Sequence, residues 1–344
     1  MTTHPRPPRA LLMASVLPLL LATACGGGAD TAGSGEPGAP EQVELTLAHS
    51  YTDQQPQHRC GAKIIADEVA AADVGLTVEI FPGSQLGGDA DRFQSVAAGD
   101  IDIDIQGASA LGASHAPMSV VDAAYAFDDA EHLARFFADP ASDGLKSGFA
   151  EATGVQVLGA WSAGARQFTA NQPIRRPADL QGLRMRFPNS PQFLMNAHAL
   201  GASPTEVAFE ELYLALQQGT VDGQENPIVN IDALNLGEVQ DHLSLSGHQQ
   251  NSNLVIVGPV WEEELSPEQQ QALSAAVDSA VDRVPGCVAE DETRILDEYR
   301  ASGAFQVVDD VDVAAFRTQA EQYLRANLSP EQLPVYEAIR AAAS

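Results

Sequence analysis

The amino-acid sequence predicts an α/β protein of two lobes whose C-terminal part is mostly helical. Three patterns indicate this class. Strand-like and helix-like runs alternate between residues 43 and 105, a second alternation starts near residue 155, and the chain past Pro259 is helical in pattern. The folded part is expected to begin near Glu41 and to run for about 300 residues, enough for one large or two medium-sized domains.

The first alternation contains two runs in which apolar and polar residues take turns, as in half-buried strands: 43–47 and 76–80. A helix is expected between them, at 62–72. A second helix at 89–98 leads into a strand at 101–105. Strands connected by helices in this order pair in parallel, with the helices as crossovers.

Three aspartates mark the strand in "GDIDIDIQG": Asp100, Asp102 and Asp104. A calcium loop needs glycine at its sixth position and glutamate at its twelfth, where this chain has Ile105 and Leu111. Calcium is therefore excluded here. The spacing places the aspartates on one side of the strand, and we expect that side at a sheet edge or at the surface.

The second alternation begins a new α/β unit, and its first helix has clear end signals. Ser190 and Pro191 suit the N-cap and first helical position, and Gly201 suits the C-terminal end. The expected elements are strands at 155–158, 167–170 and 183–187 and helices at 191–201 and 209–219.

The C-terminal part should contain one long amphipathic helix. Ser266-Pro267-Glu268 opens it, Pro285-Gly286 is expected to kink it, and Gly303 ends it. The remaining expected elements are a strand at 305–308 and two helices that start at Asp312 and Ser329.

The N-terminus resembles an export signal. A basic start is followed by an apolar run, Leu11 to Ala22, which is too short to span a membrane, and then by small residues. We expect a signal peptide at 1–24 of the bacterial lipoprotein type, with Cys25 as the lipid-modified residue; a plain secretory peptide is the alternative. Residues 25–40 lack large apolar side chains and indicate a flexible linker.

Charge and motifs exclude several function classes. The net charge is −29, which would repel nucleic acid. No nucleophile elbow, phosphate loop or dinucleotide fingerprint occurs, so no enzymatic nucleophile is visible and no cofactor is expected. The histidines lack the spacing of a zinc site, so no metal is expected either. His49, just past the first strand, is the one histidine that we expect in a cleft.

Two arginines fall where strands are expected to end, Arg166 in "GARQF" and Arg186 in "GLRMRFPN". Ligands of open α/β sheets lie beyond the carboxyl ends of strands, and a guanidinium takes a carboxylate through two parallel hydrogen bonds. An anionic small molecule is one interpretation, and a structural ion pair with one of the many acids is the other. Phe209 could be a wall for the ligand or part of the core.

The run "GASPTEVAFEELYLALQQGTVDGQENPI" resembles the DctP-type solute receptors of tripartite ATP-independent periplasmic (TRAP) transporters. "FPGSQLGG", "AGDIDI", "WSAGARQFT" and "LGEVQDHLSLSGH" continue the resemblance in that family's order, from about Glu41 to the C-terminus. It implies a two-lobed periplasmic-binding-protein-like fold with a ligand cleft between the lobes. It further implies a monomeric receptor that binds one organic carboxylate and delivers it to the integral-membrane subunits of a sodium-driven permease.

By this resemblance lobe I comprises 41–162 plus 252–290, and lobe II comprises 163–251 plus 291–344. Cys60 and Cys287 then both belong to lobe I. In an exported protein disulfides persist, so we expect the two cysteines to pair; two separate buried thiols are the alternative.

The resemblance also assigns the site. Arg186 would clamp the ligand carboxylate, Arg166 matches the second arginine, and Asn226 of "DGQENP" would contact the same carboxylate. Glu225 would be a structural acceptor at the hinge. The remaining carried-over positions are Phe209, which would pack on the ligand, and Asn189 at its flank.

One departure bears on the ligand. Sialic-acid receptors of this family carry a glutamate where this chain has Gln106 and its neighbours, which argues against sialic acid. His49 and Trp161 are side chains able to reach hydroxyl groups. A sugar acid such as a uronate or an aldonate is therefore the first expectation. A four-carbon dicarboxylate or a 2-oxo acid comes next, and an exported enzyme acting on an acidic sugar last.

Overall fold

The structure is a computed structural model that describes residues 42–343. The expected signal peptide, the linker at 25–40 and the lipidation site Cys25 lie outside the described residues. Among the described helices, none combines the length and the apolar character that a membrane crossing requires.

One mixed sheet runs through the described part of the chain. Its strands follow the order β2-β1-β3-β8-β4-β7-β5-β6, and β9 pairs with β8. The strands are β1 (Val43–His49), β2 (Leu76–Phe81), β3 (Ile103–Gln106), β4 (Gln156–Ala170), β5 (Arg184–Phe187), β6 (Ser203–Glu206), β7 (Gly223–Pro227), β8 (His242–Val257) and β9 (Gln306–Val308).

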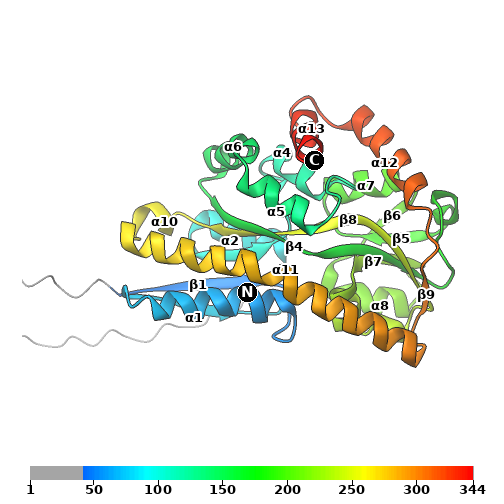
Figure 1. The fold of residues 1–344 in the computed structure, drawn as a ribbon, viewed down its shortest axis with the longest axis horizontal. Helices are drawn as coiled ribbons and strands as arrows, with labels where there is room; N and C mark the ends of the chain where they lie inside the picture. Colours follow the sequence, from blue (N-terminus) through cyan, green and yellow to red (C-terminus); the bar gives the residue numbers. More distant parts are fainter. Residues whose placement is uncertain (1–41, 344) are drawn as a thin grey trace, which may run out of the picture. The chain divides into compact units, whose positions relative to one another are not determined.

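The sheet has a parallel group at each end and an antiparallel centre. β1 pairs in parallel with β2 and β3, as predicted, and β5 pairs in parallel with β6 and β7. The long strands β4 and β8 pair antiparallel with each other between these groups (Figure 1). The two strands expected at 155–158 and 167–170 are thus parts of one strand, and both α/β halves share a continuous sheet.

Fourteen helical segments connect or cover the strands of the described range, not counting short 3-10 turns. They are a π-helix (Gln57–Ala62), α1 (Lys63–Ala71), α2 (Asp89–Ala98), α3 (Ala108–Leu111), α4 (Ala116–Ser119), α5 (Ala130–Ala138), α6 (Asp143–Thr153), α7 (Pro191–Leu200), α8 (Leu212–Gln217), α9 (Ile228–Ala233), α10 (Val260–Glu263), α11 (Pro267–Ser302), α12 (Val313–Asn327) and α13 (Leu333–Ala341).

The helix ends follow the predicted caps. In α7 the Ser190 side chain accepts a hydrogen bond from the backbone N–H of Phe193, and Gly201 ends the helix in the left-handed conformation with φ 89°. In α11 Ser266 forms a capping box, and Gly303 ends the helix. The helix is continuous for 36 residues with Pro285 inside it.

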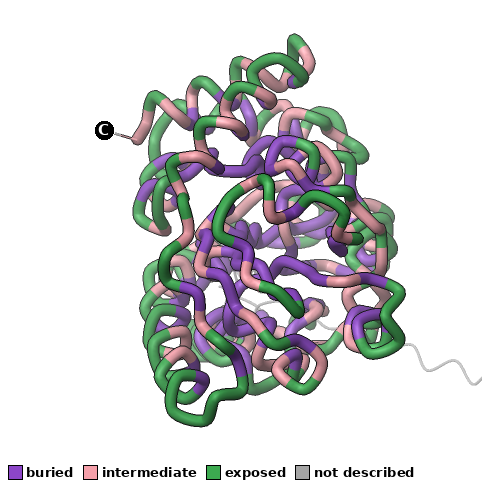
Figure 2. Tube along the Cα trace, turned by 90° about the vertical axis from the view of Figure 1, so that its right-hand side faces the viewer, coloured by how far each residue is buried: buried purple, intermediate pink, exposed green. Residues whose placement is uncertain are grey.

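Helix α11 passes α1 and β4 and reaches α9 and β9 at its far end (Figure 1). The core between it, α1 and the sheet includes Leu45, Ile65, Val277 and Val288. Figure 2 shows how buried segments occupy the interior while the outer turns of the helices are exposed. This helix therefore connects α1, which packs at the β2 end of the sheet, with α9 and β9, which pack near the centre of the sheet.

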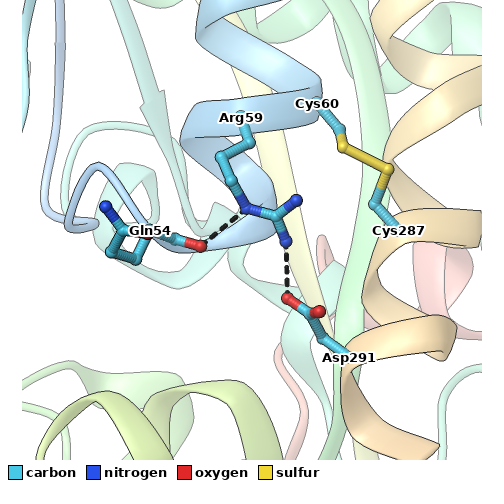
Figure 3. Close-up of a disulfide and its surroundings, with 5 residues drawn as sticks. All are labelled: Gln54, Arg59, Cys60, Cys287 and Asp291. Atoms are coloured by element: carbon cyan, nitrogen blue, oxygen red, sulfur yellow. Dashed lines mark hydrogen bonds and ion pairs between the residues drawn. A yellow bond between two sulfur atoms is a disulfide. The ribbon is translucent and has the colours of Figure 1, made fainter. Parts of the chain in front are cut away.

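A disulfide joins Cys60 of the π-helix to Cys287 of α11, which confirms the predicted pairing. Beside it the Arg59 guanidinium bonds to Asp291 of α11 at 2.7 Å and to the carbonyl oxygen of Gln54, also at 2.7 Å (Figure 3). The segment after β1 is thus fastened to the long helix at two adjacent points.

Of the aspartates of "GDIDIDIQG", Asp100 is exposed and Asp102 is half-buried, but for Asp104 the expected position at a sheet edge or at the surface is wrong. β3 lies between β1 and β8 inside the sheet. Asp104 is fully buried, and its carboxylate accepts a hydrogen bond from Arg92 Nε at 2.9 Å. The period of two indicates which side chains share a face, but the neighbouring strands decide whether that face is covered.

Candidate functional site

A cavity of about 330 Å³ opens where the parallel strands of both halves end. Ser50 and Tyr51 follow β1, Gln106 ends β3, and Pro188 and Asn189 follow β5. Strands β4, β7 and β8 contribute further residues, among them Arg166, Asn226 and Asn251. This is the position at which open α/β sheets hold ligands.

Arg166 is bound by a buried carboxylate. Its Nε and Nη2 donate to Glu225, and its Nη1 donates to Asn251 Oδ1 at 2.5 Å. Burial raises the pKa of Glu225, but the Arg166 guanidinium and the hydrogen bond with His248 outweigh it and hold that pKa below its usual value. The structural ion pair is thus present, and Arg166 lines the cavity as well.

Arg186 differs because no carboxylate neutralises it directly. The side chain is 2% exposed, its Nε donates to the carbonyl oxygen of Val207 at 2.8 Å, and its Nη1 has no hydrogen-bond partner. Burial lowers the pKa of Arg186 to about 10, so the group is still a cation at neutral pH. A buried cation with an unused donor that lines a cavity is suited to an incoming anion.

Amide and hydroxyl groups lie around the two arginines. Asn226 Oδ1 accepts from Arg166 Nη2 at 3.2 Å, which orients this amide. Gln106 is 2% exposed, and neither its amide oxygen nor its amide nitrogen has a partner. The Tyr51 oxygen accepts from Asn253 Nδ2 at 2.6 Å, so its own proton can be donated. Gln106 and Tyr51 can therefore form hydrogen bonds with hydroxyl groups of a ligand.

Two further predicted residues lie at the cavity wall. Phe209 begins the 3-10 turn Phe209–Glu211, is half-buried, and belongs to none of the hydrophobic clusters of the described residues. Of the two interpretations of Phe209, a wall for the ligand or part of the core, the structure therefore shows the position at the cavity wall. Asn189 is exposed and lies at the cavity rim.

The structure does not bring His49 and Trp161 to the cavity. His49 is fully buried, and its Nε2 lies 3.1 Å from Nδ1 of His58. Burial, followed by the charges of His58 and Arg92, lowers the pKa of His49 to about 3, so its ring is neutral. Trp161 is fully buried in the core beneath the π-helix, against Gly61. Both belong to the packing of the first half, because their strands turn these side chains away from the cavity.

Sequence reasoning missed Asn251, Asn230 and Phe193, which also line the cavity. Phe193 of α7 lies under the Arg166 guanidinium, with 4.8 Å from its carbon to the ring centroid. Asn251 sits in β8, a strand whose polar residues gave no recognisable pattern. Within residues 42–343 no group of three or more histidine, cysteine, aspartate or glutamate side chains is placed to hold a metal ion.

Several periplasmic solute-binding proteins are similar to this chain in sequence and in fold. The 2,3-diketo-L-gulonate-binding periplasmic protein of Escherichia coli is 33% identical over 280 residues, 81% of this chain and 84% of that protein. A TRAP periplasmic solute-binding protein from Roseobacter denitrificans, solved with bound L-galactonate, has a TM-score of 0.80 and 30% sequence identity, over 88% of this chain and 99% of that one.

A third protein from Polaromonas, solved with bound D-erythronate, has a TM-score of 0.82 and 28% identity, over 88% of this chain and 100% of that one. The family model of bacterial extracellular solute-binding protein family 7, named DctP, matches residues 47–329. With its mixed sheet, its cavity at the strand ends and its long helix α11, the chain belongs to this DctP family of solute-binding proteins.

Proposed function

We propose that this solute receptor binds a small polyhydroxylated carboxylate, a sugar acid such as an aldonate or a uronate. The observation that carries the proposal is the buried Arg186 guanidinium, whose Nη1 lacks a partner at the cavity. A ligand carboxylate would neutralise it, with Asn226 and Arg166 beside it. Members of this family are binding receptors rather than enzymes, and the same groups need break no bond.

The hydroxyl groups of the ligand would meet Gln106, Tyr51 and Asn189, and its carbon chain would meet Phe209. The polar partners are the reason for preferring a sugar acid, since Gln106 has an unused donor and an unused acceptor in a buried position. L-galactonate, D-erythronate and 2,3-diketo-L-gulonate, the ligands named for the three relatives, each combine a carboxylate with hydroxyl groups. A four-carbon dicarboxylate or a 2-oxo acid is the second candidate.

The receptor would close two lobes over this ligand, residues 41–162 plus 252–290 and residues 163–251 plus 291–344. β4 and β8 pass between these lobes, at register shifts between Ser162 and Ala165 and between Arg166 and Phe168. As a monomer, it would then deliver the ligand to the integral-membrane subunits of a TRAP permease.

A thermal-shift screen over aldonates, uronates, four-carbon dicarboxylates and 2-oxo acids tests the ligand class. At a free concentration of 100 times the dissociation constant, the true ligand stabilises the fold by about 2.7 kcal/mol. Calorimetry then gives the affinity, and mass spectrometry should recover the ligand chemically unchanged. A screen without any carboxylate hit would refute the proposal.

We also propose that the mature chain is held at the outer face of the membrane by a lipid on Cys25. Fractionation of cells that express the full chain tests this directly. The wild type should sediment with membranes and Cys25→Ala should be soluble outside the cytoplasm; equal distribution of the two would refute the anchor.

A further inference from the structure

The cavity contains one guanidinium that lacks a counter-ion of its own. Arg166 lies against the Glu225 carboxylate, so this buried pair is neutral as a unit. Arg186 makes one hydrogen bond, to the carbonyl oxygen of Val207, which carries no formal charge. A single ligand carboxylate would therefore give Arg186 the counter-ion that it lacks. Asp122, a buried acid of the lining, has no cation beside it among the described residues and instead accepts hydrogen bonds from the Ser109 backbone N–H and from the backbone and hydroxyl of Ser252.

The solvent side of the same cavity is lined by acids. Asp89, Asp91 and Glu210 are exposed residues of the lining. Asp89 Oδ1 accepts from the Ser50 hydroxyl at 2.8 Å, and Glu210 Oε1 accepts from the Ser84 hydroxyl at 2.9 Å. In the described part of the chain Glu210 has no cation as a partner, whereas Asp89 shares the Arg92 guanidinium with the buried Asp104.

Arg92, the basic residue near this mouth, already uses every guanidinium nitrogen in a hydrogen bond. Arg92 donates to Asp104 Oδ1 at 2.9 Å, to Asp89 Oδ1 at 2.8 Å, and to the Ser50 hydroxyl and the Gly87 carbonyl oxygen at 2.9 Å each. All three of its nitrogens are used. A second carboxylate on the ligand would face Asp89 and Glu210 with no available cation.

We propose that the cavity admits only one carboxylate, and that Asp89 and Glu210 are specificity-determining residues that reject sugar diacids and other dicarboxylates. The ligand is then a mono-anion whose far end is a neutral hydroxyl or carbonyl group. This inference rests on the proposed function, because it assumes that Arg186 receives the first carboxylate. Its physical basis is the repulsion between like charges at a site that offers only one unpaired cation.

Three six-carbon compounds of matched configuration test the inference by calorimetry with the intact protein. Galactitol has no carboxylate, L-galactonate has one and galactarate has two. The same comparison is made for the other hexonates, each with its alditol and its aldarate. We expect the best aldonate to bind at least about 100-fold more tightly than its aldarate. An aldarate that binds within about threefold of its aldonate overturns the inference and leaves the proposed function intact.

The alditols separate the two hypotheses. An alditol that binds as tightly as its aldonate overturns the proposed function, because the carboxylate then contributes nothing. If none of these compounds and no other carboxylate binds, both proposals fall together.

Substitution of the acids identifies the residues responsible. Glu210→Gln keeps an oxygen that can accept from Ser84 but removes the charge, and Asp89→Asn does the same toward Ser50. Each should lower the ratio of aldonate to aldarate affinity at least about fivefold. Asp282→Asn is the matched control, an exposed aspartate of α11 outside the cavity lining, and should leave that ratio unchanged. An unchanged ratio in both cavity variants would overturn the assignment to these acids.

Discussion

Arg92 and Arg186 are both almost completely buried, but their guanidinium groups have different surroundings. Arg92 makes hydrogen bonds through all three nitrogens, two of them to carboxylates. Arg186 makes one, and its Nη1 makes none. Burial lowers the pKa of both, but Asp104 and Asp89 reverse the effect for Arg92, whereas Arg186 stays lowered to about 10.

The difference separates a structural cation from a binding cation. The free-energy cost of burying Arg92 is offset within the folded chain by Asp104 and Asp89, so removing its guanidinium would leave a buried carboxylate without its partner. The cost of burying Arg186 is not offset in this way, and a ligand can offset it. Exposure alone cannot distinguish the two residues, and neither can their residue type; their hydrogen-bond partners do.

The largest expected effect is on the stability of Arg92→Ala. Removing the guanidinium leaves Asp104 buried without its partner, which typically costs about 3–5 kcal/mol. Urea denaturation of the unliganded protein measures this. Adding Asp104→Asn should recover part of the lost stability, because it removes the buried carboxylate that has lost its partner. A loss below about 1 kcal/mol would show that Arg92 is not the structural cation described above.

Arg186→Ala should show the opposite pattern. Ligand affinity is expected to fall by about 2–5 kcal/mol, because the carboxylate loses its cation, while the unliganded protein keeps its stability. Calorimetry with the best sugar acid and urea denaturation of the same preparation give both values. If Arg186→Ala unfolds the protein as Arg92→Ala does, the contrast between the two arginines fails.

Glu292 tests what an unpartnered buried charge does away from the cavity. Its Oε1 is buried without a hydrogen-bond partner beside Gly164, and burial raises the pKa of its carboxyl from 4.5 to about 7. The folded state holds this proton more tightly than the unfolded state does. The contribution of the Glu292 carboxyl to the free energy of unfolding is therefore fully present below pH about 4.5, and up to about 3 kcal/mol of it is lost as the pH rises through 7.

The difference in unfolding free energy between wild type and Glu292→Gln at several pH values isolates this group. The difference should change over that pH window and level off above it. Glu290→Gln, at an exposed position of the same helix, should show no such change. A constant difference for Glu292→Gln would mean that its carboxyl titrates normally.

The smallest expected effect is that of Arg186→Lys. An ammonium keeps the charge but cannot give a carboxylate two parallel hydrogen bonds, so the dissociation constant should rise about tenfold or more, equivalent to about 1.4 kcal/mol. Calorimetry measures it against Arg186→Ala. Unchanged affinity would show that the charge of Arg186 matters and its planar geometry does not.

Elements with local signals could be predicted from the sequence, and elements set by tertiary contacts could not. The caps at Ser190 and Gly201 defined α7, and alternation defined β1 and β2. β8 was missed because polar residues such as His248 and Asn251 are buried in it, where partners from other strands satisfy them. Its sequence therefore shows no apolar period.

The site was predictable in part for the same reason. Arg186 and Asn226 lie near the ends of β5 and β7, whereas Arg166, expected at a strand end, lies inside β4; all three line the cavity. His49 ends β1 and Trp161 lies inside β4, yet neither lines the cavity: Trp161 is part of the core around α11, and His49 is buried against His58. The direction of a side chain near a strand end depends on the packing of the helices, which no local pattern encodes.

The position of α11 also limits the order in which the protein can fold. Residues of β1 and α1, such as Leu45 and Val69, pack against Leu273 to Val288, so about 200 residues of intervening chain must be present before this core closes. The Cys60–Cys287 bond spans a sequence separation of 227 residues and depends on the same late encounter.

Contacts this distant in sequence slow folding and leave apolar strands uncovered in the meantime. The first half of the protein is therefore the first to be synthesised, yet it can complete its core only after α11 has been synthesised and has packed against it.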